Sequence, residues 1–203
     1  MKKPSPARHA GAPRQVRIIG GDWKRTPLPV PELEGLRPTP DRVRETVFNW
    51  IEHLQHRNWT GRRCLDLFAG TGALGFEAAS RGAAEVTMVE SHPAAARQLQ
   101  ASCDKLQATS IKVLRGDAVR QLASLSGPYD LIFLDPPYGL RLLPELLPRC
   151  ARLLLPGGLV YAESDQPFAE PRADWLQGWQ VVRADKAGQV YFGLLMPDDN
   201  AVI

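Results

Sequence analysis

The chain has 203 residues and a mass of 22.4 kDa, a size that suits one α/β domain with small additions and excludes two full domains. Hydrophobic residues make up 44% and charged residues 23%, which excludes a fully disordered chain, a collagen-like chain and a multi-span membrane protein. The net charge is +3, but residues 1–31 hold seven Lys and Arg against one acid, so the remainder carries a net −3. A basic end on a slightly acidic body indicates either a polyanionic partner or a solvated tail that aids solubility.

No membrane or targeting segment is expected. No run of residues approaches the roughly 18 apolar residues of a membrane span, and the basic start has no apolar stretch behind it. Cys64, Cys103 and Cys150 are far apart and form no CxxC pair, so we expect neither a disulfide framework nor a metal site. These features predict a cytoplasmic protein with no membrane contact.

The first residues divide into a tail and an extension. Residues 1–14 show no periodicity and predict a mobile basic tail. Residues 15–60 form the extension. Apolar residues before Gly20-Gly21 predict a short hairpin around a Gly-Gly turn, and the prolines within residues 27–31 predict a stiff extended connector.

The extension ends in a helix that begins near residue 40. Thr39 is expected as its N-cap and Pro40 as its first residue, a position that proline favours. Five apolar residues recur at helical spacing and should face the core: Val43, Val47, Trp50, Ile51 and Leu54.

From residue 61 to residue 195 the sequence alternates between strand and helix patterns. The predicted strands are Cys64–Phe68, Val86–Glu90, Ile111–Leu114, Leu131–Asp135 and Leu159–Glu163. The predicted helices are Leu74–Ser80, Pro93–Leu106, Ala118–Leu125 and Leu142–Leu154. Such alternation predicts an α/β, Rossmann-like fold with a mostly parallel sheet and helices on both faces. Trp179–Ala184 and Val190–Leu195 complete seven strands as an antiparallel pair at one edge, and residues 196–203 form a C-terminal tail.

Ligands of such sheets bind at the carboxyl ends of the strands, and a glycine-rich loop lies at the first of them. Gly70, Gly72 and Gly75 satisfy G-x-G-x-x-G directly after the predicted strand Cys64–Phe68 and at the start of a predicted helix. Glycines there allow a tight turn and close approach of a ligand to the backbone. A glycine turn without a ligand would have the same pattern, as would an NAD or FAD site.

Two further acids follow later strands on the same rim. Glu90 ends the next strand, where a carboxylate can accept hydrogen bonds from both hydroxyls of a ribose. Asp117, followed by Ala118, comes after the third strand and suits an adenine amino group.

The most specific motif is Asp135-Pro136-Pro137-Tyr138, which we call the clamp, after the apolar strand Leu131–Leu134. Two prolines remove two backbone donors and fix the chain in an extended form. The Asp135 carboxylate and the Pro136 carbonyl can then both accept hydrogen bonds, while Tyr138 offers a flat face. This combination suits a planar group that carries an NH2, and it does not suit hydride transfer.

These motifs, in this order, resemble the class I S-adenosylmethionine-dependent methyltransferases that modify exocyclic or amide nitrogens. The chain is most similar to bacterial 16S rRNA guanine-N2 methyltransferases of the RsmD type over about residues 15 to 195. The N-terminal segments that carry this closer resemblance are Arg17-Ile18-Ile19-Gly20-Gly21, Arg37-Pro38-Thr39, Arg42-x-Arg44-Glu45 and Phe48-Asn49.

The resemblance implies methyl transfer from S-adenosylmethionine to N2 of one guanine of the small subunit or its assembly intermediate. Expected cofactor-binding residues are Asp66, Phe68, Ala69, Gly70, Thr71, Gly72, Glu90, Asp117 and Ala118. Expected catalytic residues are Asp135, Pro136, Pro137 and Tyr138. Residues expected to bind RNA are Arg17, Lys24, Arg25, Arg37, Thr39 and Arg42. No metal is required.

Other functions remain open from the sequence. A DNA adenine-N6 or cytosine-N4 methyltransferase could use the same clamp, but 203 residues leave little room for a target-recognition domain. A protein glutamine-N5 methyltransferase typically has Asn where Asp135 stands. An NAD-dependent oxidoreductase is supported only by the glycine pattern, and a non-enzymatic RNA-binding module leaves the clamp unexplained. We expect a monomer, because no strong additional apolar face is evident.

Overall fold

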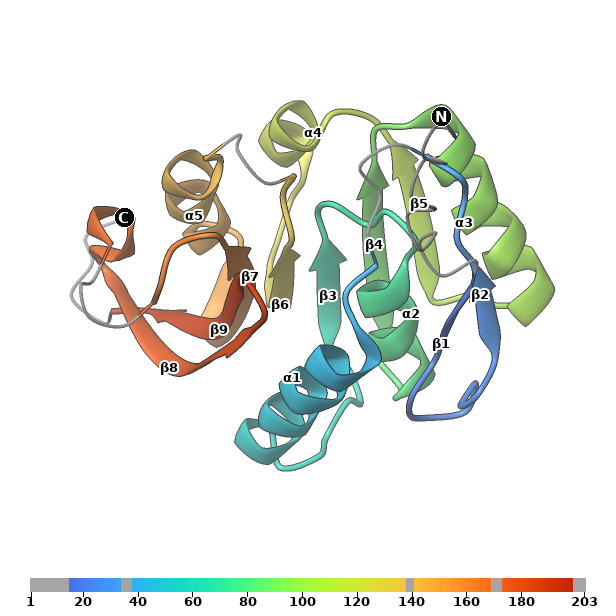
Figure 1. Ribbon diagram of the computed structural model, residues 1–203, viewed down its shortest axis with the longest axis horizontal. Helices are drawn as coiled ribbons and strands as arrows, with labels where there is room; N and C mark the ends of the chain where they lie inside the picture. Colours follow the sequence, from blue (N-terminus) through green and yellow to red (C-terminus); the bar gives the residue numbers. More distant parts are fainter. Residues whose placement is uncertain (1–14, 34–37, 138–140, 169–172, 199–203) are drawn as a thin grey trace, which may run out of the picture.

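A computed structural model describes residues 15–33, 38–137, 141–168 and 173–198 (Figure 1). The strands are β1 (Gln15–Arg17), β2 (Pro27–Pro29), β3 (Arg63–Asp66), β4 (Glu85–Glu90), β5 (Ile111–Arg115), β6 (Tyr129–Leu134), β7 (Leu154–Ser164), β8 (Trp179–Ala187) and β9 (Val190–Pro197). The helices are α1 (Asp41–Leu54), α2 (Ala73–Ser80), α3 (Pro93–Leu106), α4 (Ala118–Ser124), α5 (Leu143–Ala151) and the 3₁₀ turn η1 (Asp174–Leu176). The predicted α/β fold is confirmed.

Seven strands form one sheet in the order β5-β4-β3-β6-β7-β9-β8. β5, β4, β3, β6 and β7 are parallel to one another, and β9 runs antiparallel to both β7 and β8. The predicted antiparallel pair at one edge is therefore confirmed. Strand order reverses between β3 and β6, so the crevice at their carboxyl ends is the position where ligands of such sheets bind.

Alternate residues of the central strands enter two hydrophobic layers, as side chains of a strand buried on both faces must. On β6, Leu131 and Phe133 pack with α1, α2 and α3, while Ile132 and Leu134 pack with α4 and α5. All four side chains are fully buried. Burial on both faces explains why Leu131–Leu134 is an uninterrupted apolar run.

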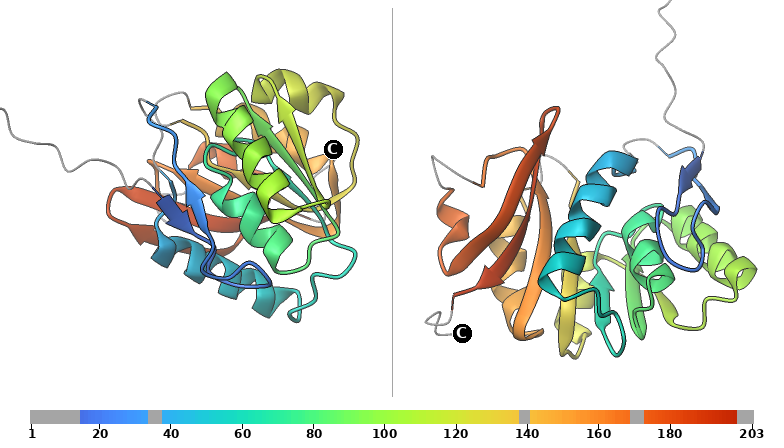
Figure 2. Two further views of the ribbon diagram at one scale, coloured as in Figure 1. Left: turned by 90° about the vertical axis from the view of Figure 1, so that its right-hand side faces the viewer. Right: turned by 90° about the horizontal axis from the view of Figure 1, so that it is seen from below.

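Helix α1 packs across the β6–β7 side of the sheet (Figure 2). Phe48 lies against Phe133, with ring centroids 5.8 Å apart, and Trp50 stacks on Phe192 of β9 at 5.6 Å. The predicted core residues Val43, Val47 and Ile51 are buried, whereas Trp50 and Leu54 are half-buried against the same layer.

The start of α1 differs from its prediction. Pro40, rather than Thr39, is the N-cap, and no side chain caps the helix. Thr39 instead directs its hydroxyl at acidic residues of the sheet edge, described below.

The predicted hairpin is present, but its loop is longer than a Gly-Gly turn. β1 pairs with β2, with Val16 opposite Leu28, and residues 18–26 form the connection. Gly21 has φ +73°, and a Cβ there would lie 1.8 Å from the carbonyl oxygen of Ser80, so only glycine fits against α2. The sequence predicts that the prolines form an extended connector. Pro27–Pro29 is extended, but it is the second strand of the hairpin rather than a connector. A two-stranded edge tolerates prolines because their missing N–H need not be paired.

Helix α5 ends at Ala151, three residues before the predicted end. Leu154 already pairs with Tyr129 as β7 begins, and the pairing shifts register before Leu159 meets Leu131. Pro156-Gly157-Gly158 at this irregularity concealed the early start of β7.

No helix within the described ranges is long and apolar enough to cross a membrane. Division of the chain at residues 14, 60 and 195 stays a prediction.

Candidate active site

Loops after β3, β4, β5 and β6 meet at one edge of the sheet (Figure 1). They carry the glycine loop, Glu90, Asp117 and the clamp, so the motifs predicted from separate parts of the sequence share one rim. Each lies at a carboxyl end because the five parallel strands all point the same way.

The glycine loop is a left-handed turn that leads into α2. Gly70 and Gly72 have φ of +53° and +77°, and Gly72 is the N-cap of α2. A Cβ on Gly72 would come within 2.6 Å of Leu99 and Phe76. Glycine is therefore favoured at the turn, because a side chain there would be strained at this φ and would crowd Leu99 and Phe76.

Asp66 holds this loop from below. Its side chain is 2% exposed, and its Oδ2 accepts a hydrogen bond from the backbone N of Gly75 at 3.0 Å. Burial raises the pKa of Asp66 to about 7, with a further rise from Glu90 and opposing hydrogen bonds from the backbone of Gly75 and Phe68. The Asp66 carboxyl group therefore binds backbone N–H groups of the glycine loop.

Glu90 and Asp117 lie side by side at the next two strand ends. The Glu90 carboxylate is half-buried and accepts from the backbone N of Gly70 at 2.8 Å and of His92 at 2.6 Å. Asp117 caps α4 by accepting from the N of Arg120 at 2.9 Å. The backbone N of Gly116 donates to the Glu90 carbonyl at 2.9 Å, which joins the two loops.

The clamp carboxyl lies beside a second carboxyl that we did not predict as a site residue. The Thr39 hydroxyl is 3.5 Å from Asp135 Oδ2 and 3.2 Å from Glu163 Oε1. Tyr161 donates to the same Glu163 oxygen at 2.7 Å. Glu163 is 5% exposed and Thr39 6%. We call Asp135, Glu163, Thr39 and Tyr161 the acid cluster.

The electrostatic setting of Asp135 is unusual for an aspartate. Part of the residue is exposed, but protein atoms crowd its carboxyl group. Burial, then the negative charges of Glu163 and Asp66, raise the pKa of Asp135 well above its ordinary range, and the Thr39 hydrogen bond opposes this rise. Asp135 is therefore a more basic carboxylate than an exposed one.

A hollow of about 180 Å³ opens beside the clamp. Pro136, Pro137 and Glu163 line part of it, and residues 141–144, residues 164–166 and Trp175 line the rest. Trp175 is held by a hydrogen bond from its Nε1 to Gln166 and by an edge contact with Phe168. The hollow leads to the acid cluster, because Glu163 belongs to both.

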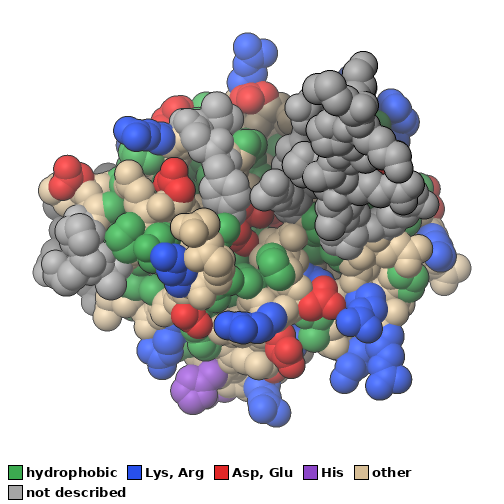
Figure 3. Space-filling model, in the orientation of Figure 1, with side chains coloured by type: hydrophobic (Ala, Val, Ile, Leu, Met, Phe, Trp, Pro, Cys, Tyr) green, Lys and Arg blue, Asp and Glu red, His purple; other side chains and the backbone are tan. Residues whose placement is uncertain are grey.

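The predicted RNA-binding residues fall into three groups. Lys24, Arg25 and Arg42 are exposed, and the Arg17 side chain is 70% exposed beside Asp41 at 3.2 Å. In the space-filling view, Lys and Arg side chains gather over the β1–β2 hairpin, at the lower right (Figure 3). Thr39 lies in the acid cluster instead. Arg37, like Tyr138 of the clamp, lies outside the described residues.

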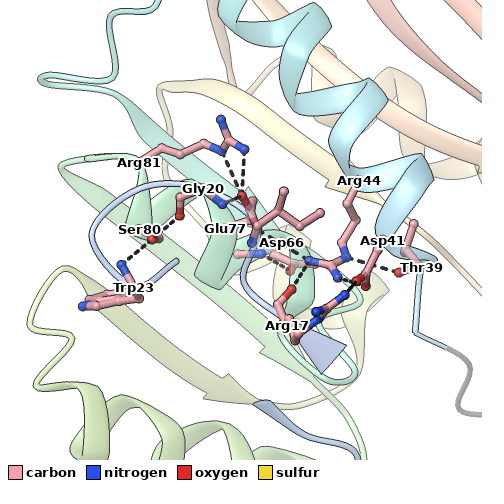
Figure 4. A network of polar contacts seen from close by, with 12 residues as sticks. Arg17, Gly20, Trp23, Thr39, Asp41, Arg44, Asp66, Glu77, Ser80 and Arg81 are labelled. Atoms are coloured by element: carbon pink, nitrogen blue, oxygen red, sulfur yellow. Dashed lines mark hydrogen bonds and ion pairs between the residues drawn. The ribbon is translucent and has the colours of Figure 1, made fainter. Parts of the chain in front are cut away.

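Another buried carboxylate, Glu77 of α2, fixes the N-terminal extension to the sheet (Figure 4). It accepts from the backbone N of Ile19 and of Gly20, both at 2.7 Å, and pairs with Arg81 at 2.8 Å and Arg44 at 3.5 Å.

Arg44 is fully buried within this cluster. It donates to Asp41 at 2.6 Å, to the Arg17 carbonyl at 2.9 Å and to the Thr39 carbonyl at 3.2 Å. Burial lowers the pKa of Arg44, and Asp41 and Glu77 oppose that. We call Glu77, Arg81 and Arg44 the Glu77 cluster.

Sequence reasoning missed both Glu163 and Glu77. Glu163 ends a predicted strand, which is the signal that singled out Glu90, so it could have been found. Glu77 carries no such signal, because it lies in the middle of a helix. Within the described ranges, no three His, Cys, Asp or Glu side chains are arranged to hold a metal ion.

Comparison with known proteins identifies a family and several relatives that this chain resembles over most of its length. The family described as "Conserved hypothetical protein 95" matches residues 16–196. Ribosomal RNA small subunit methyltransferase D from Escherichia coli K12 is 40% identical over 200 residues, covering 96% of this chain and 94% of the relative. The protein of the same name from Haemophilus influenzae is 37% identical, covering 89% and 93%.

A solved structure shares the whole fold. "Putative methyltransferase yhhF from Escherichia coli" superposes with a TM-score of 0.78 at 36% identity, covering 91% of this chain and 98% of that one. The family match over residues 16–196 includes the hairpin, α1 and the seven-stranded sheet, so the extension is part of what the family shares.

Proposed function

Because the chain belongs to the Conserved hypothetical protein 95 family of methyltransferases, we propose that it transfers a methyl group from S-adenosylmethionine to N2 of a guanine in 16S rRNA. Two relatives named ribosomal RNA small subunit methyltransferase D support rRNA as the substrate. The observation that carries the choice of an amine is the clamp, in which a basic carboxylate and a proline carbonyl stand at a hollow beside the cofactor rim.

The rim suits the proposed cofactor. The half-buried Glu90 carboxylate offers acceptors to ribose hydroxyls, and its hold on Gly70 keeps the glycine turn open beneath them. Asp117 and Ala118 stand where adenine would lie, at the end of the neighbouring strand. S-adenosylmethionine, when bound, supplies a methyl group on a positively charged sulfur.

The hollow beside the clamp suits a single base. Its volume of about 180 Å³ is below the roughly 300–1,000 Å³ of drug-sized pockets, so its occupant is small. A guanine in an RNA loop can leave its stack at little cost. Pro136 and Pro137 offer a flat apolar wall, and Asp135 directly precedes them in the chain.

The chemistry that the clamp provides is alignment and charge stabilisation. The N2 lone pair of guanine is delocalised into the ring, which makes N2 a poor nucleophile. Hydrogen bonds from its two protons to the Asp135 carboxylate and the Pro136 carbonyl localise that pair and fix its direction. Acceptors held in place for a developing positive charge lower the barrier without reorganisation.

Exposed basic residues of the extension provide the RNA contact. Lys24 and Arg25 lie on the hairpin loop and Arg42 on the first turn of α1, on elements that the Glu77 cluster fixes to α2. Lys and Arg on such a surface bind phosphates with little sequence discrimination. The monomeric state and the cytoplasmic location stay predictions of the sequence.

The test is methyl transfer from labelled S-adenosylmethionine to small subunits that lack the modification. We expect label in N2-methylguanosine of 16S rRNA, and a loss of about 10²–10⁴-fold in rate for Asp135→Ala with folding and cofactor binding retained. Label in DNA or protein instead would retain the methyltransferase and reject its rRNA substrate. Transfer by Asp135→Ala at the wild-type rate would reject the role of the clamp.

A further inference from the structure

The acid cluster contains more than the clamp needs for hydrogen bonding alone. On the basis of the proposed methyl transfer, we propose that Glu163 and Thr39 are positioning residues that set Asp135 to receive the proton that guanine N2 loses. The inference begins from their geometry: one hydroxyl lies within 3.5 Å of both carboxyl groups, and Glu163, which carries one of them, also lines the hollow proposed for the base.

The three residues come from separate elements that converge at this point. Asp135 follows β6, Glu163 lies near the end of β7, and Thr39 precedes α1, 96 residues before Asp135 in the chain. Strands β6 and β7 are parallel neighbours, with Leu134 opposite Ala162, so Asp135 and Glu163 follow paired positions on one edge. Residue placement of this kind does not arise from local sequence.

A second carboxyl group beside Asp135 is costly, since desolvation and like-charge repulsion both act against the ionisation of Asp135. A fold that needed only packing here would place an apolar residue on β7. Instead, Glu163 is fixed by Tyr161 at 2.7 Å and by Thr39 at 3.2 Å. Clusters of this kind are concentrated at sites where a proton must be held or moved.

The groups around Asp135 act in opposite directions. Glu163 from β7 and Asp66 from β3 place negative charge beside it and raise its pKa, whereas the Thr39 hydroxyl lowers it by hydrogen bonding to the ionised form. Tyr161 acts through Glu163, and Arg141 lines the outer part of the hollow. Glu163 thus makes Asp135 a stronger base, and Thr39 preserves enough of its ionised form to act.

The step balances without any further reactant. The bond from N2 to the methyl carbon forms while the bond from sulfur to that carbon breaks, and its electron pair stays on sulfur. The N2–H bond breaks, its electron pair stays on nitrogen, and the proton goes to the ionised Asp135 carboxylate. Thr39 can then reorient its hydroxyl and accept a hydrogen bond from the protonated acid.

The first test needs no substrate. The carboxyl carbon of Asp135 is titrated by NMR in protein with ¹³C-labelled aspartate, and Asp135→Asn identifies its signal. Glu163→Gln removes a negative charge and keeps the shape, so we expect the midpoint to fall to lower pH. Thr39→Val removes the hydroxyl, so the midpoint should rise, while Thr39→Ser, which keeps the hydroxyl, should stay near wild type.

The second test follows the acid limb of the pH–rate profile in a single turnover on unmodified subunits, with both cofactor and subunit saturating. The limb should move to lower pH in Glu163→Gln and to higher pH in Thr39→Val. A purely structural role would not move two variants in opposite directions. Unmoved midpoints, or shifts of both variants in the same direction, would overturn the inference in either test.

Failure of the proposed function has a separate signature. Wild-type protein that places no methyl group in 16S rRNA rejects the proposed substrate, and the inference for that substrate is rejected with it. Wild-type protein that methylates N2, with acid limbs that coincide across the variants, rejects only the role of Glu163 and Thr39.

Discussion

Two regions of this molecule bury carboxyl groups under opposite conditions. In the Glu77 cluster, a fully buried carboxylate accepts from two backbone N–H groups and pairs with two arginines. In the acid cluster, the charges that act most on Asp135 are those of two further carboxyls, Glu163 and Asp66. The partners of Glu77 therefore stabilise its ionised form. The neighbouring carboxyl groups of Asp135 destabilise its ionised form.

We interpret this difference as the mark of a structural role for Glu77 and a chemical role for Asp135. Glu77 closes the contact between α2 and the hairpin, where a stable ionised acid is useful and a reactive one is not. Asp135 stands at the sheet edge beside a hollow, where a carboxyl group with a raised pKa can exchange a proton. Both acids are connected through the residues before and within α1, since Thr39 contributes its hydroxyl to one cluster and its carbonyl to the other.

The largest effect on stability is expected at Glu77. Glu77→Ala leaves Arg44 buried with one partner fewer and two backbone N–H groups unpaired, so we expect a loss of about 3–5 kcal/mol in the free energy of unfolding. Urea denaturation measures it. The matched control is Glu145→Ala, which removes an exposed partner of Arg149 at the same i,i+4 spacing and should cost less than about 1 kcal/mol. Equal losses of unfolding free energy in Glu77→Ala and Glu145→Ala would show that the buried carboxylate contributes no more than the exposed one.

Cofactor affinity should respond to Glu90. Removal of its carboxylate takes away the partner of the Gly70 N–H and the proposed contacts to ribose hydroxyls. Charge-assisted hydrogen bonds are worth about 1.5–3 kcal/mol, so Glu90→Ala should weaken S-adenosylmethionine binding by about 10–100-fold in calorimetry. Glu85→Ala, at the opposite end of the same strand, should leave the affinity unchanged.

The pH dependence of stability should follow Asp66. Its pKa of about 7 lies above the ordinary value of 3.8, so the folded protein keeps a proton that the unfolded chain has already released. The contribution is therefore fully present below about pH 4 and is lost as the pH rises toward 7, with a slope of at most about 1.4 kcal/mol per pH unit.

Asp66→Asn tests this sign directly. Its amide oxygen can still accept from Gly75 N, while the titrating group is gone, so the decline in unfolding free energy between pH 4 and 7 should be shallower than in wild type. Thermal unfolding at several pH values gives the comparison. A decline as steep as that of the wild type would show that other groups cause it.

The smallest expected effects lie on the basic surface. Lys24→Ala and Arg42→Ala should each reduce the salt dependence of small-subunit binding by about one unit of slope, without altering the chemical step. Lys105→Ala, on the exposed side of α3, is the matched control and should leave the slope unchanged. A change for Lys105 equal to that for Lys24 would place the RNA contact elsewhere.

The sequence determines much of this account through periodicity and strand ends. Leu131–Leu134 reads as a buried strand because both of its faces are covered, and the rim motifs follow from the parallel strands that carry them. The residues that contact those motifs from distant parts of the chain could not be predicted from periodicity or strand ends. Thr39 has the local pattern of a helix cap. Its contact with Glu163 joins positions 124 residues apart, so no local pattern indicates that contact.

We infer that the acid cluster serves the reaction and the Glu77 cluster serves the fold. Asp135→Ala and Glu77→Gln, measured for both single-turnover methyl transfer and urea unfolding, test it most directly. We predict that Asp135→Ala loses about 10²–10⁴-fold in rate with an unfolding free energy within about 1 kcal/mol of wild type. Glu77→Gln should lose stability and, while folded, transfer methyl groups at a rate near that of the wild type. A folded Glu77→Gln as slow as Asp135→Ala, or an Asp135→Ala as unstable as Glu77→Gln, would contradict the account.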